Sequence, residues 1–161
     1  MAFALRLRLP ELEKLWPVQA TFFYKSFDRN WFVWQHRDTV IPVAKHHSLP
    51  GWKNPTYKEG VPFIEPPWAI AAECLALRLH FDNCPDGHLE LVPGSHKKSF
   101  DSEDIPAETL SLQKSDALIM NPWLIHSSGK ITNPGSMRRV IHILYGPKQL
   151  PSPFNWFQFV A

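Results

Sequence analysis

The stretch FFYKSFDRNWFVWQHRD, Phe22–Asp38, carries the features that set the fold class. Two runs rich in aromatic and β-branched residues, ATFFYKSF and NWFVWQH, meet at the turn-forming triplet DRN. Runs of this kind, bounded by turn residues, predict two β-strands. The second run ends in His36 and Asp38, which are two positions apart. On a strand these two side chains point to the same face, with Arg37 on the opposite face.

The rest of the chain repeats this alternation of short apolar runs and turns. Five more runs resemble strands: ECLALRLHF, HLELV, DALIM, WLIHS and RRVIHILY. The stretches between them are predicted loops, among them SLPGWKNPTYKEG, HKKSFDSEDIP and GKITNPGS. The 16 scattered prolines disfavour long helices, and one short helix is predicted over PELEKLW, with Pro10 in its first turn. The pattern predicts a mainly all-β fold, either a β-sandwich or a jelly-roll barrel with a few short helices.

The composition indicates a single globular domain spanning residues 1–161. Hydrophobic residues make up 44% of the chain and charged residues 20%, with a net charge of +2. This balance offers no basic surface for nucleic acid or for a membrane. No apolar run is long enough to cross a bilayer, and the first residues lack the features of a signal peptide. We therefore expect a cytoplasmic protein.

Cysteine and tryptophan residues give further expectations about packing. Cys74 and Cys84 are predicted to be reduced thiols, and a disulfide between them is not excluded. Trp31, Trp34 and Trp123 are expected in the core. A second group of tryptophans is expected in loops, where they could cover a cavity or form a dimer contact: Trp52, Trp68 and Trp156.

A metal centre is the functional interpretation of His36 and Asp38. A third ligand from another strand would complete the two-histidine, one-carboxylate face of non-haem Fe(II) oxygenases. His126, at the end of an apolar run and followed by small residues, is the best candidate. The His-x-Asp pattern alone is a weak signal. Without a partner such as His126, the pair would be better interpreted as the polar end of a strand.

A second His-x-Asp pair, His80 and Asp82, competes with the first. Between Asp82 and His126 there is room for little more than HLELV and DALIM. A jelly roll places several strands between its two metal-bearing strands, and only the first pair leaves room for them. We therefore expect His80 and Asp82 to be strand-end and turn residues.

Arginines are the candidates for binding an anionic cosubstrate. Strand alternation places Arg138 and His142 on one face of RRVIHILY and Arg139 on the other. An arginine near the floor of the cavity could bind a dicarboxylate bidentately, but polarity alone does not choose between Arg138 and Arg139. Arg78 could also face the cavity and aid cosubstrate binding, although a surface ion pair fits its position equally well.

Three segments together resemble the phytanoyl-CoA dioxygenase-like proteins. They are FFYKSFDRNWFVWQHRD, DNCPDGHLELVPGSHKKSF and ALIMNPWLIHSSGKITNPGSMRRVIHILY, and the resemblance extends from about Ala20 to Tyr145. It implies a double-stranded β-helix, a form of jelly-roll barrel, with Fe(II) and 2-oxoglutarate as cofactors. Carried over by residue, it implies three iron ligands and two contacts to the C5 carboxylate of 2-oxoglutarate. The ligands are His36, Asp38 and His126, and the contacts are Arg138 and, less directly, Ser128.

The resemblance implies a dioxygenase that hydroxylates a small-molecule substrate. Asp38 favours hydroxylation over halogenation, because related halogenases have a small residue in place of that carboxylate. Only about 35 residues precede His36, which keeps open an alternative: a jelly-roll binding protein that has lost catalysis. A nucleic-acid demethylase of the same superfamily is disfavoured, because Leu144 stands where those enzymes carry a second arginine, and because the net charge is near neutral.

Overall fold

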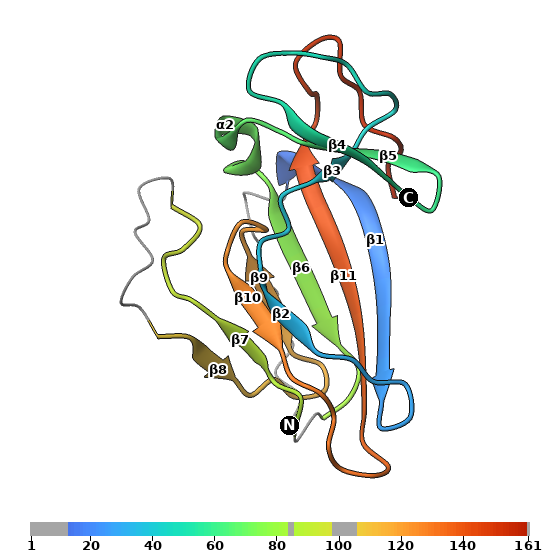
Figure 1. Ribbon diagram of the computed structural model, residues 1–161, viewed down its shortest axis with the longest axis vertical. Helices are drawn as coiled ribbons and strands as arrows, with labels where there is room; N and C mark the ends of the chain where they lie inside the picture. Colours follow the sequence, from blue (N-terminus) through green and yellow to red (C-terminus); the bar gives the residue numbers. More distant parts are fainter. Residues whose placement is uncertain (1–12, 84–85, 98–105, 161) are drawn as a thin grey trace.

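The computed structural model describes residues 13–83, 86–97 and 106–160. It shows a jelly roll, a double-stranded β-helix in which two four-stranded antiparallel sheets face each other and a three-stranded sheet lies at one end (Figure 1). The predicted fold class is therefore confirmed. One short helix is labelled, α2, at Trp68–Ala71.

Two four-stranded sheets form the barrel. The larger sheet has the order β1-β11-β6-β9, made of Leu15–Ser26, Met137–Pro147, Leu75–His80 and Ala117–Met120. The smaller sheet has the order β2-β10-β7-β8, made of Val33–His36, His126–Ser128, Leu89–Leu91 and Glu108–Leu110. The third sheet, β3-β5-β4, is made of Ile41–Pro42, Val61–Glu65 and Lys53–Lys58.

The chain winds back and forth between the two larger sheets, which explains how distant residues meet. It passes from β1 to β2, then to β6, to β7 and β8, to β9, to β10 and finally to β11. Consecutive strands therefore usually lie in opposite sheets. As a result β2 pairs with β10, about 90 positions further along the chain, and β11 lies between β1 and β6. The β3-β5-β4 sheet and α2 are inserted between β2 and β6.

The barrel interior is apolar at one end and polar in its middle. Next to the three-stranded sheet, a cluster of buried residues forms the main core: Val18, Ile41, Val43, Ile64, Cys74, Leu144, Phe154 and Trp156. Further along the same strands, the inward positions carry Lys25, Arg78 and Arg138, all buried. Burying a charge is costly unless the charge is compensated, so this part of the interior is where a function is expected.

The structure corrects two predictions of local structure, one for the loop at 48–60 and one for the end of the helix at 10–16. The predicted loop 48–60 contains β4, which forms a hairpin with β5 through Glu59 and Gly60 at φ of 50° and 82°. Two positive φ values are typical of a type I′ turn. Because of the lysines and the proline in this segment, the sequence pattern did not predict the strand. Of the helix predicted at 10–16, residues 10–12 lie outside the described part and Glu13 is helical, but Lys14 is in a turn and Leu15 and Trp16 begin β1.

The predictions for tryptophan were partly wrong. Trp34 is 79% exposed and Trp31 37%, so neither belongs to the apolar core. Trp156 is buried in that core, and its Nε1 donates a hydrogen bond to the Pro147 carbonyl. Strand alternation does not tell which face of an edge strand is covered by the rest of the protein. The positions of these rings therefore depend on tertiary packing. Cys74 is buried, and Cys84 lies outside the described residues, so a bond between them is untested.

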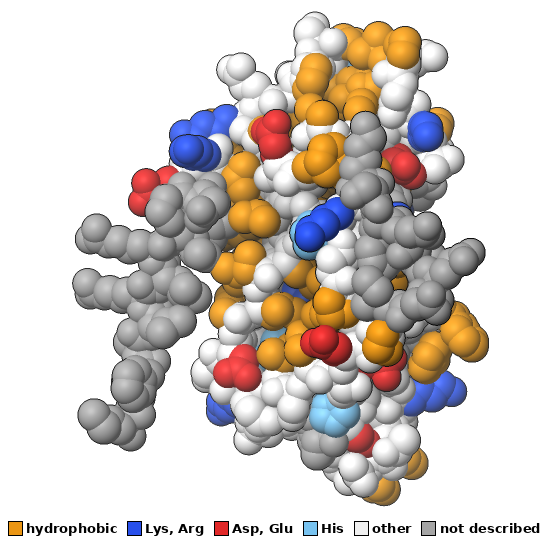
Figure 2. All heavy atoms as spheres, turned by 90° about the vertical axis from the view of Figure 1, so that its left-hand side faces the viewer, with side chains coloured by type: hydrophobic (Ala, Val, Ile, Leu, Met, Phe, Trp, Pro, Cys, Tyr) orange, Lys and Arg blue, Asp and Glu red, His pale blue; other side chains and the backbone are white. Residues whose placement is uncertain are grey.

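The surface combines apolar and charged groups. On the face shown in Figure 2, hydrophobic side chains gather in clusters, with basic and acidic side chains scattered among them. Within the described ranges, no helix has both the length and the apolar character needed to cross a membrane.

Candidate metal centre

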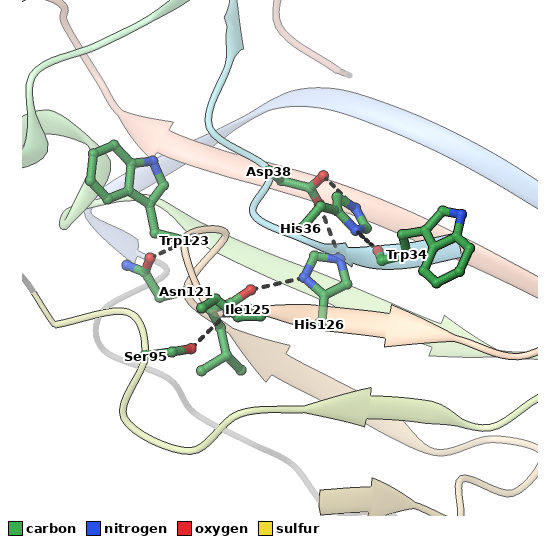
Figure 3. A network of polar contacts seen from close by, with 9 residues as sticks. Trp34, His36, Asp38, Ser95, Asn121, Trp123, Ile125 and His126 are labelled. Carbon is green, nitrogen blue, oxygen red and sulfur yellow. Dashed lines mark hydrogen bonds and ion pairs between the residues drawn. The ribbon is translucent and has the colours of Figure 1, made fainter. Parts of the chain in front are cut away.

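Two histidines face each other because their strands are antiparallel neighbours. His36 is the last residue of β2 and His126 is the first of β10, and the pairing register sets the two opposite each other. Their ring centroids are 4.3 Å apart. Residues that are 90 positions apart in the chain are thus brought together by one strand pair (Figure 3).

Asp38 lies just beyond the end of β2 and completes the group. Its backbone N–H donates to the Pro122 carbonyl at 2.9 Å, which ties the chain to the turn before β10. One carboxylate oxygen lies 3.5 Å from His36 Nε2, and the other lies 3.6 Å from His126 Nε2. The three ligand atoms lie within 4.8 Å of one another, and no other such group of three occurs among the described residues.

Backbone carbonyls orient both imidazoles. His36 Nδ1 lies 2.8 Å from the Trp34 carbonyl, and His126 Nδ1 lies 2.9 Å from the Leu124 carbonyl. A carbonyl can only accept, so each Nδ1 carries a proton, and the neutral form of each ring has its lone pair on Nε2. This is how metal-binding histidines are usually held, with the second nitrogen hydrogen-bonded.

The donor set and its spacing suit a divalent transition metal. Ligand atoms about 2.1 Å from a shared metal lie between about 3 and 4.2 Å apart, and the separations of 3.5 and 3.6 Å fall in that range. Two imidazoles and one carboxylate on one side of an ion leave its other positions open. The side chain of His126 is only 4% exposed, whereas those of His36 and Asp38 are 39% and 41% exposed. The open side of the group therefore faces the solvent-accessible space.

Electrostatics keep the carboxylate charged. Burial raises the pKa of Asp38, but the hydrogen bond from His36 and the charges of the nearby histidines outweigh it and lower that pKa to about 2. The hydrogen bond with Asp38 raises the pKa of His36, while burial lowers the pKa of His126. At neutral pH the ionised Asp38 carboxylate and a neutral His126 are the forms that can bind a cation.

An inner cavity of about 100 Å³ adjoins the three residues and is rich in positive charge. Its lining includes Lys25, Arg78 and Arg138, which are 1%, 7% and 7% exposed. Among the described residues that line it, Asp38 is the only acid. The described lining of this cavity therefore has an excess of cations and is suited to an anion with more than one negative charge.

Ser128 lies between two of these cations. Its Oγ accepts hydrogen bonds from Arg138 at 3.1 Å and from Lys25 Nζ at 3.3 Å. Lys25 also donates to the Gly129 carbonyl at 3.0 Å, and Arg138 donates to the Gly87 carbonyl. The two cationic groups are thus held by the Ser128 hydroxyl on β10 and by the backbone carbonyls of Gly129, after β10, and Gly87, before β7.

Arg78 completes the cationic lining from β6. The alternative of a surface ion pair is wrong, because Arg78 is buried, and its Nε has no hydrogen-bond partner among the described residues. Burial, together with the charge of Arg138, lowers its pKa to about 10, so the side chain still carries its charge at neutral pH. A buried guanidinium with an unsatisfied N–H is a group that an anion in this cavity would satisfy.

A larger cavity of about 480 Å³, called here the outer cavity, also adjoins His36 and Asp38. It shares four lining residues with the inner cavity: Phe23, His36, Asp38 and His142. The rest of its wall combines apolar side chains such as Phe63 and Leu144 with polar ones such as Gln19 and Lys58. Burial and the charge of Arg78 lower the pKa of His142 to about 4, so this shared side chain is neutral at neutral pH.

The competing pair, His80 and Asp82, does not converge on a ligand site. His80 points into the barrel, where neither ring nitrogen has a hydrogen-bond partner within the described ranges, and burial lowers its pKa to about 4. Asp82 lies on the outside and binds Arg139, with contacts of 2.7 and 3.0 Å to the guanidinium. This pairing also shows that Arg139 faces outward and Arg138 inward, as the sequence analysis expected.

Lys25 is the lining residue that the sequence analysis missed. Lys25 occurs in FFYKSF on β1, two positions after Phe23 and four positions after Thr21. Both of these residues line the outer cavity. The signal that could have found it is a lysine among aromatic residues of a predicted strand, at a position that strand alternation places on the inward face. Trp31, expected in the core, lies instead against this lysine, with Nζ 4.9 Å from its ring centroid.

Comparisons with known proteins show the fold. No family model and no curated protein sequence matches this chain. Among solved structures, the carbocyclase SnoK from nogalamycin biosynthesis, described as non-heme and alpha-ketoglutarate-dependent, is 14% identical, with a TM-score of 0.58 over 84% of this chain and 51% of that one. AviO1 from Streptomyces viridochromogenes Tue57 is 23% identical, with a TM-score of 0.56 over 85% and 53%.

A third structure of this fold contains a metal ion. HygX from Streptomyces hygroscopicus, solved with iron bound, is 17% identical, with a TM-score of 0.52 over 83% of this chain and 58% of that one. HygX has also been solved with nickel and 2-oxoglutarate. The present chain spans about half the length of these three proteins. The likeness establishes that the chain has the fold of non-haem 2-oxoglutarate-dependent enzymes.

Proposed function

We propose that the protein is an Fe(II)- and 2-oxoglutarate-dependent dioxygenase that oxidises a small molecule. The observation that carries this proposal is that two features line the same cavity. A two-histidine, one-carboxylate group lies at the mouth of a small chamber, and three buried cations line that chamber. The first feature suits a divalent metal with open positions, and the second suits a dicarboxylate.

The proposed roles follow from the positions of the side chains. His36, Asp38 and His126 would hold the iron. Arg138 would bind the C5 carboxylate of 2-oxoglutarate together with Ser128, while Lys25 and Arg78 would compensate the remaining negative charge. Bound Fe(II), with 2-oxoglutarate and dioxygen, supplies an oxidative decarboxylation that yields succinate and CO₂ and oxidises a C–H bond. The protein contributes orientation of the two reactants and exclusion of water.

Charge balance favours a dianion in the inner chamber. Among the described residues that line the inner cavity, Lys25, Arg78 and Arg138 carry three positive charges and Asp38 carries one negative charge. An iron ion next to Asp38 would add further positive charge. A dicarboxylate offers two negative charges and several acceptor oxygens, which would offset much of the desolvation cost of these cations.

The outer cavity is the proposed substrate site. It adjoins the open side of the three residues, and its mixed lining suits a small organic molecule with apolar and polar parts. Among proteins of this fold, HygX has been solved with hygromycin B together with nickel and 2-oxoglutarate. We propose that this chain acts as a single domain and as a hydroxylase of the phytanoyl-CoA dioxygenase-like type, in line with the sequence resemblance.

The direct test is turnover of 2-oxoglutarate without a substrate. Purified protein loaded with Fe(II) without oxygen, then exposed to air with 2-oxoglutarate, is expected to form succinate slowly, because the open positions at the metal permit uncoupled reaction. Succinate and CO₂ are measured with and without iron. An iron-loaded protein that neither binds 2-oxoglutarate nor forms succinate would support the alternative, a jelly-roll binding protein without catalysis.

Lys25→Met is expected to weaken 2-oxoglutarate binding by at least about tenfold, because it removes one charged hydrogen-bond donor from the inner chamber at nearly constant volume. The dissociation constant is measured by calorimetry on the Mn(II)-loaded protein without oxygen. Lys130→Met is the control, since Lys130 is exposed and close in sequence to the same segment. Equal binding by both variants would remove Lys25 from the cosubstrate site.

A further inference from the structure

Ser95 contacts both of the segments that carry the candidate metal ligands. It lies in the loop that follows β7, within the motif PGSH at 93–96, and it is 1% exposed. The sequence analysis assigned no chemistry to this motif. In the structure the loop lies beside the turn that precedes β10, and the side chain of Ser95 points to the backbone there (Figure 3).

The first contact reaches His126 through a single peptide group. The backbone N–H of Ile125 donates to Ser95 Oγ at 2.7 Å. This N–H belongs to the same peptide group as the Leu124 carbonyl, which accepts the hydrogen bond of His126 Nδ1 at 2.9 Å. The serine hydroxyl therefore holds one end of the rigid peptide plane whose other end orients the imidazole. Linked hydrogen bonds of this kind also polarise and strengthen one another.

The second contact reaches the segment between the other two ligands. Arg37, which lies between His36 and Asp38, donates from its guanidinium to the Ser95 carbonyl at 3.0 Å. The backbone before Ser95 also binds the turn before β10, because the Val92 N–H donates to the Ile125 carbonyl at 2.9 Å. A single buried residue is thus connected to both sides of the candidate metal centre, across segments that are about 90 positions apart in sequence.

We propose that Ser95 is a positioning residue that sets the direction of His126 Nε2 through the Leu124–Ile125 peptide and links it to the His36–Asp38 segment through Arg37. This inference rests on the proposed metal centre. Without the hydroxyl, the Ile125 N–H loses its acceptor, and the peptide plane can tilt toward another partner. The imidazole would then lose a fixed acceptor for Nδ1. Loss of an outer hydrogen bond of this kind typically costs 10- to 100-fold in metal affinity.

The test compares Ser95→Ala with a core variant of similar stability. Val43→Ala truncates a fully buried side chain in the main core cluster and touches neither the serine nor the ligands. Co(II) affinity is measured by competition with a chromophoric chelator, and the visible absorption of the Co(II) form reports the geometry at the metal. Melting temperatures of the metal-free proteins show how much each variant is destabilised.

Ser95→Ala is expected to weaken Co(II) binding about 10- to 100-fold and to change the visible spectrum, whereas Val43→Ala changes neither. Ser95→Cys, which keeps a weak acceptor of similar size, is expected to fall between Ser95→Ala and the wild type, and it serves if Ser95→Ala does not fold. Wild-type affinity and spectrum in the Ser95 variants would overturn the inference, as would an equal loss in Val43→Ala. A wild-type protein that binds no Co(II) would overturn the metal centre itself.

Discussion

His126→Ala is expected to abolish stoichiometric Fe(II) binding. The variant removes one of the three proposed ligands, and His126 is the most deeply buried of the three. The two remaining ligands, His36 and Asp38, are about 40% exposed and would hold iron only as a weak surface pair. Iron content is measured on protein reconstituted without oxygen and then passed through a desalting column. His36→Ala and Asp38→Ala are expected to give the same result.

His80→Ala is the matched control for this experiment. His80 is also a buried histidine on the inner face of the barrel, and it forms no hydrogen bond through either ring nitrogen. Removing it deletes an imidazole of the same size from the same interior and should leave iron binding intact. If His80→Ala or Asp82→Ala lost iron while folded, and His36→Ala kept it, the assignment of the ligands would be wrong.

Arg138→Ala is expected to weaken 2-oxoglutarate binding by at least about a hundredfold while metal binding persists. In the buried chamber, a guanidinium–carboxylate pair is a charge-assisted contact, and removing the cation leaves the carboxylate without its partner at a cost of roughly 2–5 kcal/mol. Binding is measured by calorimetric titration of the Mn(II)-loaded protein with 2-oxoglutarate in the absence of oxygen.

Arg139→Ala is the control that the strand itself provides. Arg139 is the next residue of β11, but it faces outward and pairs with Asp82 at 2.7 Å. Its loss should leave 2-oxoglutarate binding within a factor of a few, because the Arg139 side chain does not line the inner cavity. The opposite ranking of the two variants would mean that the cosubstrate is not bound on the inner face of β11.

The sequence by itself determined most strands of the two four-stranded sheets and the inward positions on β11. Short aromatic and β-branched runs between turns predicted a β-sandwich or a jelly roll, and the structure is a jelly roll. Alternation on RRVIHILY predicted that Arg138 and His142 share a face, and both line the inner cavity. These predictions succeed because alternation is a local property of a strand, and each run carries it independently of the rest of the chain. That the predicted ligands bind iron stays a prediction.

Only the tertiary structure decided which distant residues meet. The cationic chamber joins Lys25 of β1, Arg78 of β6 and Arg138 of β11, and these strands are neighbours through β11 alone. Ser95 is linked to His126 through the Leu124–Ile125 peptide group. Only the packing of the loop after β7 against the turn before β10 brings Ser95 close to this peptide group. Strand pairing and loop packing depend on the register and burial of the whole barrel, which spacing along the chain does not record. The same cause placed Trp34 at the surface and Trp156 in the core.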